Sequence, residues 1–232
     1  RLQEHIDRLY NSAHIYMMKI PYSKQTIIEA HKEVVRANRL RECYLRPIAF
    51  YGSEKMGVSP RGAQVHVAVA AWPWGAYLGD DAVTKGVRMK ISSWSRHGHN
   101  TMPPASKTTG NYVNSSLAKV EALKGGYDEA ILLNQEGKIA EGSGENIFIV
   151  RRGALRTTPR SAILEGITRE VVLEVARDAG IAARVGPLLG LLQEVHEFDR
   201  AARARLERPA VGAEHHRRGR GLGVLENLAD GG

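Results

Sequence analysis

The chain has 232 residues, of which 43% are hydrophobic and 25% charged, which supports one large domain or two smaller ones with their own cores. Its net charge of +8 is compatible with nucleic-acid binding, but no basic face with interleaved aromatic residues accompanies it, so we expect no nucleic-acid partner. No apolar stretch approaches the roughly 20 residues of a membrane span, so we also expect no membrane partner.

Cysteine content and the first residues bear on the compartment. Cys43 is the lone cysteine, which excludes an intramolecular disulfide and favours a reducing, cytoplasmic location. The opening residues 1–5 lack the apolar core of a signal peptide. They also lack an initiating methionine and begin within a helical pattern, so we expect that this is not the native start.

The first 75 residues predict two helices and then two strands. Apolar residues at helical spacing indicate helices over 2–15 and 24–39. Residues 43–50 are strand-like, and residues 65–72 form a stronger strand that is too apolar on both faces to be an exposed edge.

Glycine and proline in residues 73–79 interrupt this pattern and indicate a loop between domains. We therefore expect a small domain over 1–75, an interdomain loop over 76–84 and a large domain over 85–232.

The second half predicts strands with two intervening helices. Strands are expected at 87–94, 130–134, 138–140, 146–150 and 181–185, with those between 130 and 150 antiparallel. A helix beginning near Asn111 has Val113, Leu117, Val120 and Leu123 on one face, and a second helix begins at Gly166. Residues 193–232 are rich in arginine and glycine, lack a periodic apolar face and are typical of disorder.

Lys107, Tyr112 and Glu141 combine an amine, a phenol and a carboxylate among glycines and small residues. These are the groups used with pyridoxal phosphate (PLP), where a protein supplies an amine, a partner for the ring nitrogen and orientation. A carboxylate at Glu141 would keep a pyridinium nitrogen protonated. The alternative interpretation is a solvated lysine and a glycine-rich turn with carboxylates facing water, and spacing alone leaves both open.

The helix that begins near Ile167 and Thr168 predicts an anion site. A helix N-terminus presents free N–H groups and the positive end of the helix dipole to a phosphate. Simple capping by Thr168 is the alternative. His97 and His99 lack partners at metal-ligand spacing, so we expect no metal.

Seven segments in one order extend the pattern over about residues 1–193. They are Arg8-Leu-Tyr-Asn-Ser-Ala13, Tyr44-Leu-Arg46-Pro47, Pro73-Trp74-Gly-Ala-Tyr77-Leu-Gly79, Ser92-Ser-Trp-Ser-Arg96, Lys107-Thr-Thr-Gly-Asn-Tyr112, Glu141-Gly-Ser-Gly-Glu-Asn146 and Gly166-Ile-Thr-Arg169. Together they resemble the fold-type IV PLP aminotransferases and, among these, the branched-chain amino-acid aminotransferases. The resemblance implies an α+β or α/β protein with a small N-terminal α/β domain and a larger domain containing a mostly antiparallel sheet or barrel.

The resemblance also implies a role for each matched residue. Lys107 would bind the cofactor covalently and transfer the proton between the substrate α-carbon and the cofactor. Glu141 would bind the ring nitrogen and Tyr112 the ring oxygen, while Arg8, Ile167 and Thr168 would hold the phosphate. The substrate side would consist of Tyr44, Arg46, Trp74 and Tyr77.

Two departures from the family pattern stand out. The family has a further N-terminal segment with early strands and pocket aromatics. It also has a Gly-Thr-Ala-like phosphate turn beyond residue 193. Neither is present here, so we expect that the chain is N-terminally truncated, and our hypothesis is that residues 193–232 are frameshifted, misassembled or misassigned.

The expected activity is transamination of leucine, isoleucine or valine with 2-oxoglutarate, in a homodimer or a larger homo-oligomer. One alternative is another fold-type IV enzyme, such as a D-amino-acid or (R)-amine transaminase or a lyase acting on aminodeoxychorismate. A second alternative is a non-catalytic relative whose basic tail binds nucleic acid.

Overall fold

The computed structural model of the chain describes residues 1–75 and 82–188. Among these residues, no helix is both long and apolar enough to cross a bilayer. Most of the interdomain loop predicted at 76–84, including Tyr77, lies outside the described residues. The unusual segment 193–232 lies outside them as well.

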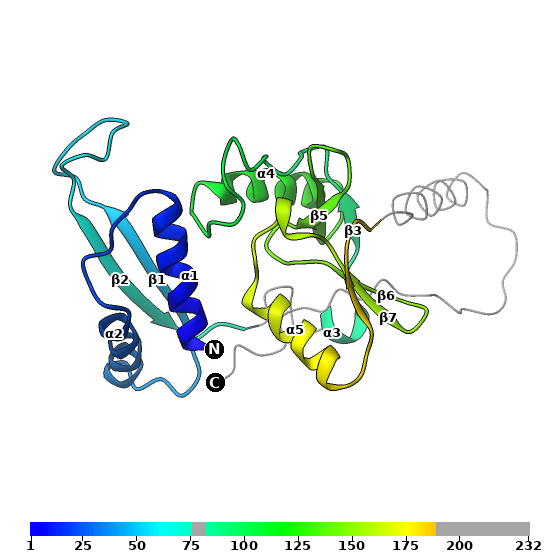
Figure 1. Cartoon of the computed structure of the whole chain (residues 1–232), viewed down its shortest axis with the longest axis horizontal. Helices are drawn as coiled ribbons and strands as arrows, with labels where there is room; N and C mark the ends of the chain where they lie inside the picture. The colour runs from blue at the N-terminus through cyan, green and yellow to red at the C-terminus, as the bar shows by residue number, and fades with distance from the viewer. Residues whose placement is uncertain (76–81, 189–232) are drawn as a thin grey trace, which may run out of the picture.

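Two helices and a hairpin form the N-terminal part of the molecule, as the sequence predicts. They are α1 (Leu2–Ile15), α2 (Lys24–Ala37), β1 (Tyr44–Tyr51) and β2 (Val65–Trp72). The Ser23 hydroxyl caps α2 by accepting a hydrogen bond from the Thr26 amide at 3.1 Å. The two helices pack together through buried Ile6, Ile27 and Ile28, with Val67 of β2 against them (Figure 1).

The β1–β2 sheet corrects one prediction. It is a two-stranded antiparallel ladder that runs from the Tyr44–Trp72 pair to the Tyr51–Val65 pair. Its positions alternate between half-buried and exposed, so β2 is not covered on both faces within the described residues. The outward side chains of β2 are His66, Ala68 and Ala70. These alanines made the strand look apolar on both faces in the sequence, but exposing the single methyl group of an alanine to water costs little free energy.

The central sheet consists of β3 (Met89–Ile91), β4 (Glu129–Leu133) and β5 (Ile139–Gly142). The β3–β4 pair is parallel and the β4–β5 pair is antiparallel. A short helix, α3 (Ala82–Lys85), precedes β3 and was not predicted. The predicted strand 87–94 is shortened to β3. The Ser92 amide still donates to the Ile131 carbonyl of β4, but the amide of Ser93 donates to the Glu121 carboxylate instead of continuing the ladder.

Helix α4 (Asn111–Lys124) turns a different face to the protein from the one its aliphatic residues suggest. Val113, Leu117, Val120 and Leu123 are all exposed. The inward face instead carries small or polar residues, among them Ser115, Ala118 and Ala122. Ala118 and Ala122 pack on Ala130 and Leu132 of β4, because small side chains let the helix axis approach the sheet closely.

A third sheet lies beyond the central one and consists of β6 (Phe148–Arg151), β7 (Ala154–Thr157) and β8 (Ala183–Val185). The strands predicted between 130 and 150 are present and lie in antiparallel pairs, but β6 pairs with β7, a strand that the sequence did not indicate, and not with β5. Arg152 and Gly153 both adopt positive φ and close this hairpin tightly. The β7–β8 pair is parallel.

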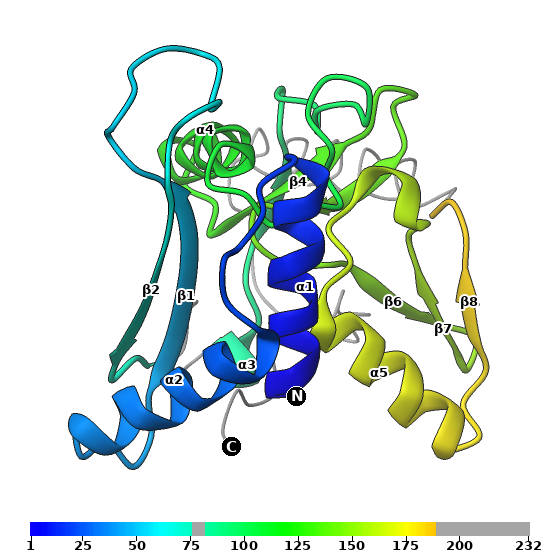
Figure 2. The same ribbon diagram turned by 60° about the vertical axis from the view of Figure 1, so that its left-hand side comes forward.

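A single-turn 3-10 helix (Arg160–Ala162) and α5 (Ile167–Asp178) complete the described structure. Ala176 of α5 packs on Phe148 and Leu155 of the third sheet. Helix α1 faces α5, to which it is joined by an ion pair between Arg1 and Glu174 (Figure 2). The arrangement confirms the α+β class and brings the ends of α1, α4, β5 and α5 toward one another.

A buried position in the central sheet and an exposed position in the third sheet give a stability prediction. Leu132 is fully buried under α4, so Leu132→Ala should lower the free energy of unfolding by about 2–5 kcal/mol. Val150 on β6 is 76% exposed, and Val150→Ala should change it by less than about 0.5 kcal/mol. Urea unfolding of both variants measures the difference, and equal effects would contradict this placement of the core.

Candidate active site

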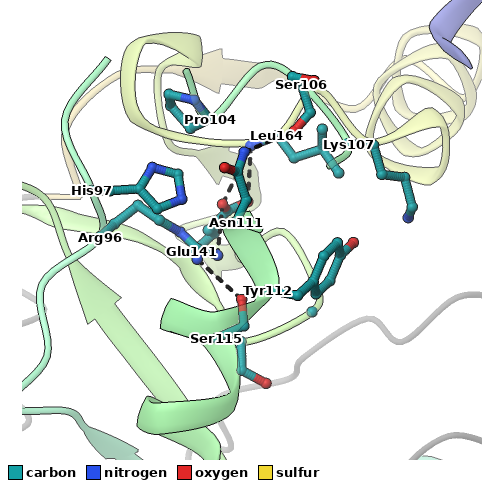
Figure 3. Close-up of a pocket in the computed structure, with 12 residues that line it drawn as sticks. Arg96, His97, Pro104, Ser106, Lys107, Asn111, Tyr112, Ser115, Glu141 and Leu164 are labelled. Atoms are coloured by element: carbon teal, nitrogen blue, oxygen red, sulfur yellow. Dashed lines mark hydrogen bonds and ion pairs between the residues drawn. The ribbon is translucent and has the colours of Figure 1, made fainter. Parts of the chain in front are cut away.

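A pocket lies where the loop before α4, the start of α4 and the end of β5 meet (Figure 3). It holds about 350 Å³ of space not filled by atoms, open solvent included. The predicted residues Lys107, Tyr112 and Glu141 all line it, together with Arg96 and Ser143. The structure thus brings together three groups that lie up to 34 positions apart in the sequence.

The loop that carries Lys107 is fastened to α1. The Lys107 amide donates to the hydroxyl of buried Ser12 at 2.9 Å, and the Ser106 hydroxyl donates to the Ser12 carbonyl at 3.2 Å. The Asn111 side chain donates to the carbonyls of Pro103 and Ser106 at 3.0 and 2.9 Å. These bonds fix the backbone of Lys107 between two helices while its side chain extends to the pocket.

The Lys107 side chain lies beside Tyr112, with Nζ 5.9 Å from the centre of the phenol ring. Lys107 is exposed, so burial does not provide the desolvated setting that a reactive lysine can use. The other route to a neutral amine is a positively biased site. The charges of Arg8, Arg46 and Arg96 reach Tyr112, whereas the opposite charge of Glu141 reaches both Tyr112 and Lys107.

Tyr112 is half-buried, and burial is the main cause that raises the pKa of its phenol. The charge of Arg8 opposes the shift, and that of Glu141 adds to it. The phenol therefore stays protonated at neutral pH and can donate a hydrogen bond into the pocket.

Glu141 is the most constrained acidic group of the pocket. It is 5% exposed, and its carboxylate lies 2.9 Å from Arg96 Nη2. It also accepts hydrogen bonds from the Leu164 amide and from Asn146 Nδ2, each at 3.1 Å. Burial nevertheless raises the pKa of Glu141 to about 7, because loss of hydration outweighs the opposing charge of Arg96. The group can thus exchange a proton near neutral pH.

Arg96 is a site residue to which the sequence assigned no role. Its guanidinium is buried, and besides Glu141 it donates to Asn114 Oδ1 and Ser115 Oγ, both at 3.1 Å, and to the Gly142 carbonyl at 3.3 Å. It therefore holds β5 against α4. Arg96 lies in an irregular polar segment without periodicity, so its partners can be identified only from the fold.

The α5 N-terminus supports the predicted anion site. No described side chain caps this helix, so capping by Thr168 is not observed and the amides of Ile167 and Thr168 stay available. Arg8 reaches this end from α1, with Nη1 3.5 Å from the Glu165 carbonyl.

Gly166 connects the α5 N-terminus to Glu141. A Cβ atom at Gly166 would lie 2.2 Å from Asn146 Oδ1, and Asn146 donates to Glu141. Only glycine fits this contact, which holds the predicted anion site and the predicted ring partner in a fixed relation.

The predicted substrate residues form a separate cluster at one end of the β1–β2 hairpin. The Arg46 guanidinium lies 5.2 Å from the ring centre of Tyr44 and 5.8 Å from that of Trp74. Trp72, which the sequence did not single out, is the cross-strand partner of Tyr44 and completes the cluster. These residues do not line the pocket described here, although the charge of Arg46 reaches Tyr112.

Comparison with known proteins then decides the family. The family described as "Amino-transferase class IV" matches residues 1–202. The chain belongs to this family. A branched-chain-amino-acid aminotransferase from Pseudomonas aeruginosa is 50% identical over 180 residues, which are 78% of this chain and 59% of the relative. The Escherichia coli K12 protein of the same name is 44% identical over 186 residues, covering 79% and 60%.

A solved structure agrees with this assignment. The T.th. branched-chain amino acid aminotransferase with pyridoxamine 5'-phosphate superposes with a TM-score of 0.77 at 51% identity, covering 81% of this chain and 62% of that one. The chain therefore has the fold-type IV aminotransferase fold. It spans about 60% of the length of the curated relatives that it matches.

Class IV aminotransferases depend on PLP, and the residues of this pocket fit that cofactor. The pocket offers an amine, a protonated phenol and a buried carboxylate with a raised pKa, and an uncapped helix N-terminus lies close to the same carboxylate. Across residues 1–75 and 82–188, no group of three or more metal-ligating side chains lies close enough to hold a metal ion.

The raised pKa of Glu141 predicts a pH-dependent stability. Its proton stabilises the folded state fully below the unfolded pKa of 4.5, and this contribution is lost as the pH rises to about 7. Glu141→Gln should remove this dependence, which amounts to about 3 kcal/mol in total. Unfolding midpoints between pH 4.5 and 7 measure it. A variant as pH-dependent as the parent would show that Glu141 is ionised throughout.

Proposed function

We propose that the chain carries the PLP site of an enzyme that transaminates leucine, isoleucine and valine with 2-oxoglutarate, giving branched-chain 2-oxo acids and L-glutamate. The observation that carries this proposal is the presence of Lys107, Tyr112 and Glu141 in one pocket beside the α5 N-terminus. Relatives at 44–50% identity carry the branched-chain name, and one similar structure contains pyridoxamine 5'-phosphate.

Each residue of the pocket receives one role in the proposal. Glu141, held by Arg96, accepts a hydrogen bond from the ring nitrogen, and Tyr112 donates one to the ring oxygen. Arg8 and the amides of Ile167 and Thr168 hold the phosphate. When bound, the cofactor supplies an electron sink for the electrons of the broken α-carbon bond.

Lys107 moves the proton. As a neutral amine it would remove the substrate α-proton as a general base, hold it as an ammonium group and release it again as a general acid. Its backbone bonds to Ser12 keep the base of the side chain in place, while the exposed chain retains the reach for both transfers.

The substrate side of the proposal uses residues from the small domain over 1–75 and the loop after it. Arg46 binds a carboxylate, and Tyr44 and Trp74 give an apolar wall to a branched side chain. Tyr77 joins them in the proposal and lies outside the described residues. Such a site must accept both a branched apolar chain and the γ-carboxylate of glutamate.

The proposal includes assembly into a homodimer or larger homo-oligomer and a cytoplasmic location. The exposed aliphatic side chains Val113, Leu117, Val120 and Leu123 of α4 support assembly, since such a stripe is costly to leave in water. The lone Cys43 supports a reducing compartment.

Replacement of the lysine tests the catalytic assignment. Lys107→Ala should abolish the visible absorbance of bound PLP and lower the transamination rate by at least about 10²–10⁴-fold, because the proton carrier is lost. Lys124→Ala, at the exposed C-terminal end of α4, is the matched control and should leave both unchanged. Retained turnover in Lys107→Ala would refute the role of Lys107.

Substrate stereochemistry tests the specificity. L-leucine with 2-oxoglutarate should be turned over, and D-alanine should not, when glutamate formation is followed with each donor. Turnover of D-alanine alone would move the protein to the D-amino-acid group of the same family.

A further inference from the structure

Two glutamates lie behind the segment that carries Glu141, and the proposed reaction uses neither. Glu129 stands at the start of β4 and is fully buried, at 0% exposure. Glu145 follows the turn after β5, and its Oε1 atom is buried as well. Each carboxyl group is within hydrogen-bonding reach of the other.

Glu129 is well supplied with donors. Its Oε2 lies 2.6 Å from the Lys119 ammonium group of α4, and its Oε1 accepts the Ala130 amide at 2.6 Å. The Ser143 side chain donates to it as well. These donors lower the pKa of Glu129 in spite of its burial, so this member of the pair is a carboxylate.

Glu145 has the opposite surroundings. Its Oε2 accepts the Gly144 amide at 2.7 Å, but its buried Oε1 receives no donor from the described part of the chain. Two ionised carboxyl groups in this position would repel each other and leave that oxygen unsatisfied. A proton on Glu145 removes both problems, because it converts the contact into an O–H···O⁻ hydrogen bond to Glu129.

The charged groups around Glu145 agree with this state. Burial raises its pKa to about 8, and the negative charge of Glu129 adds to the shift. The positive charge of Lys119, from α4, opposes the shift, and Lys119 is itself paired with Glu129.

The same pair holds every residue of the intervening turn. The Gly142 amide donates to the Glu145 carbonyl at 2.8 Å, and a Cβ atom at Gly142 would lie only 3.0 Å from Glu145 Cδ. Ser143 is bonded to Glu129 and Gly144 to Glu145. Ser143 and Gly144 also line the pocket, next to Glu141.

We propose that Glu129 and Glu145 share one proton and that the resulting acid–carboxylate pair is a positioning element for the pocket wall from Glu141 to Gly144. The shared proton and the position of the turn are properties of the protein without any cofactor. The consequence for cofactor binding rests on the proposed function. Loss of the proton restores repulsion at the base of the turn and loosens the wall that presents Glu141.

The first experiment measures the proton on the full chain without cofactor. Since the folded state holds a proton that the unfolded state has released, stability falls as the pH rises through about 8. Between pH 7 and 8, the unfolding midpoint should fall in the parent and in Glu136→Gln, an exposed glutamate of the β4–β5 turn, with a slope of about one proton. Glu145→Gln, a neutral isostere, should keep only the small slope left by Glu141, whose pKa is about 7, and a slope equal to that of the parent would overturn the proposal.

A direct titration of the glutamate side chains in the parent does not depend on whether the variant folds. Carboxyl ¹³C signals of the parent, labelled at glutamate, should include one that titrates near pH 8. If no glutamate signal other than that of Glu141 titrates above pH 6, Glu145 is ionised at neutral pH and the proposal is wrong.

A second readout tests positioning and separates this inference from the proposed function. PLP binding to the parent should weaken on the alkaline side of pH 8, whereas Glu145→Gln should keep its affinity there. If the parent binds PLP and Glu145→Gln loses affinity on the alkaline side of pH 8 to the same extent, the positioning role fails and the proposed function stands. If no PLP binds but the stability slope disappears in Glu145→Gln, the proposed function fails and the shared proton stands.

Discussion

The buried ion pair between Arg96 and Glu141 is the interaction on which the rest of the pocket depends. Its two side chains are each 6% exposed and 2.9 Å apart, and each has further partners on different elements. Arg96 binds α4 and the end of β5, while Glu141 binds the segment that leads into α5. Removing Glu141 would leave Arg96 as an uncompensated buried charge, which is far more costly than the pair is stabilising. The pair therefore fixes the helix start that carries Tyr112 relative to the helix start proposed to hold a phosphate.

Three glutamates within one short region show how surroundings decide protonation. Glu129 has a lysine and an amide as donors and is ionised, while Glu145 faces that carboxylate and has a raised pKa. Glu141 lies between these extremes, with a pKa near 7, because burial and Arg96 oppose each other. A cationic ring nitrogen would favour its ionised form further. The chemistry of the pocket thus depends on how β4, β5 and α4 distribute a few donors, rather than on the number of acidic residues.

Sequence reasoning recovered the parts that depend on local chemistry. Helices α1, α2, α4 and α5 follow from periodicity, and Lys107, Tyr112 and Glu141 were selected because of their residue types and neighbouring glycines. It failed where distant packing decides. The aliphatic face of α4 points outward because the alanines on the other face permit a closer approach to β4. Strand β6 pairs with β7, which was not predicted because its segment is basic. Arg96 and the Glu129–Glu145 pair acquire meaning only from partners more than ten positions away.

The identity of the lysine that holds the cofactor tests the central claim most directly. Incubation of the chain with PLP, reduction with borohydride and peptide mapping by mass spectrometry would locate the modified residue. We expect a single pyridoxyl group on Lys107, the lysine held between α1 and α4 beside Tyr112. Modification of another lysine with Lys107 unmodified, or no stoichiometric modification at all, would contradict it.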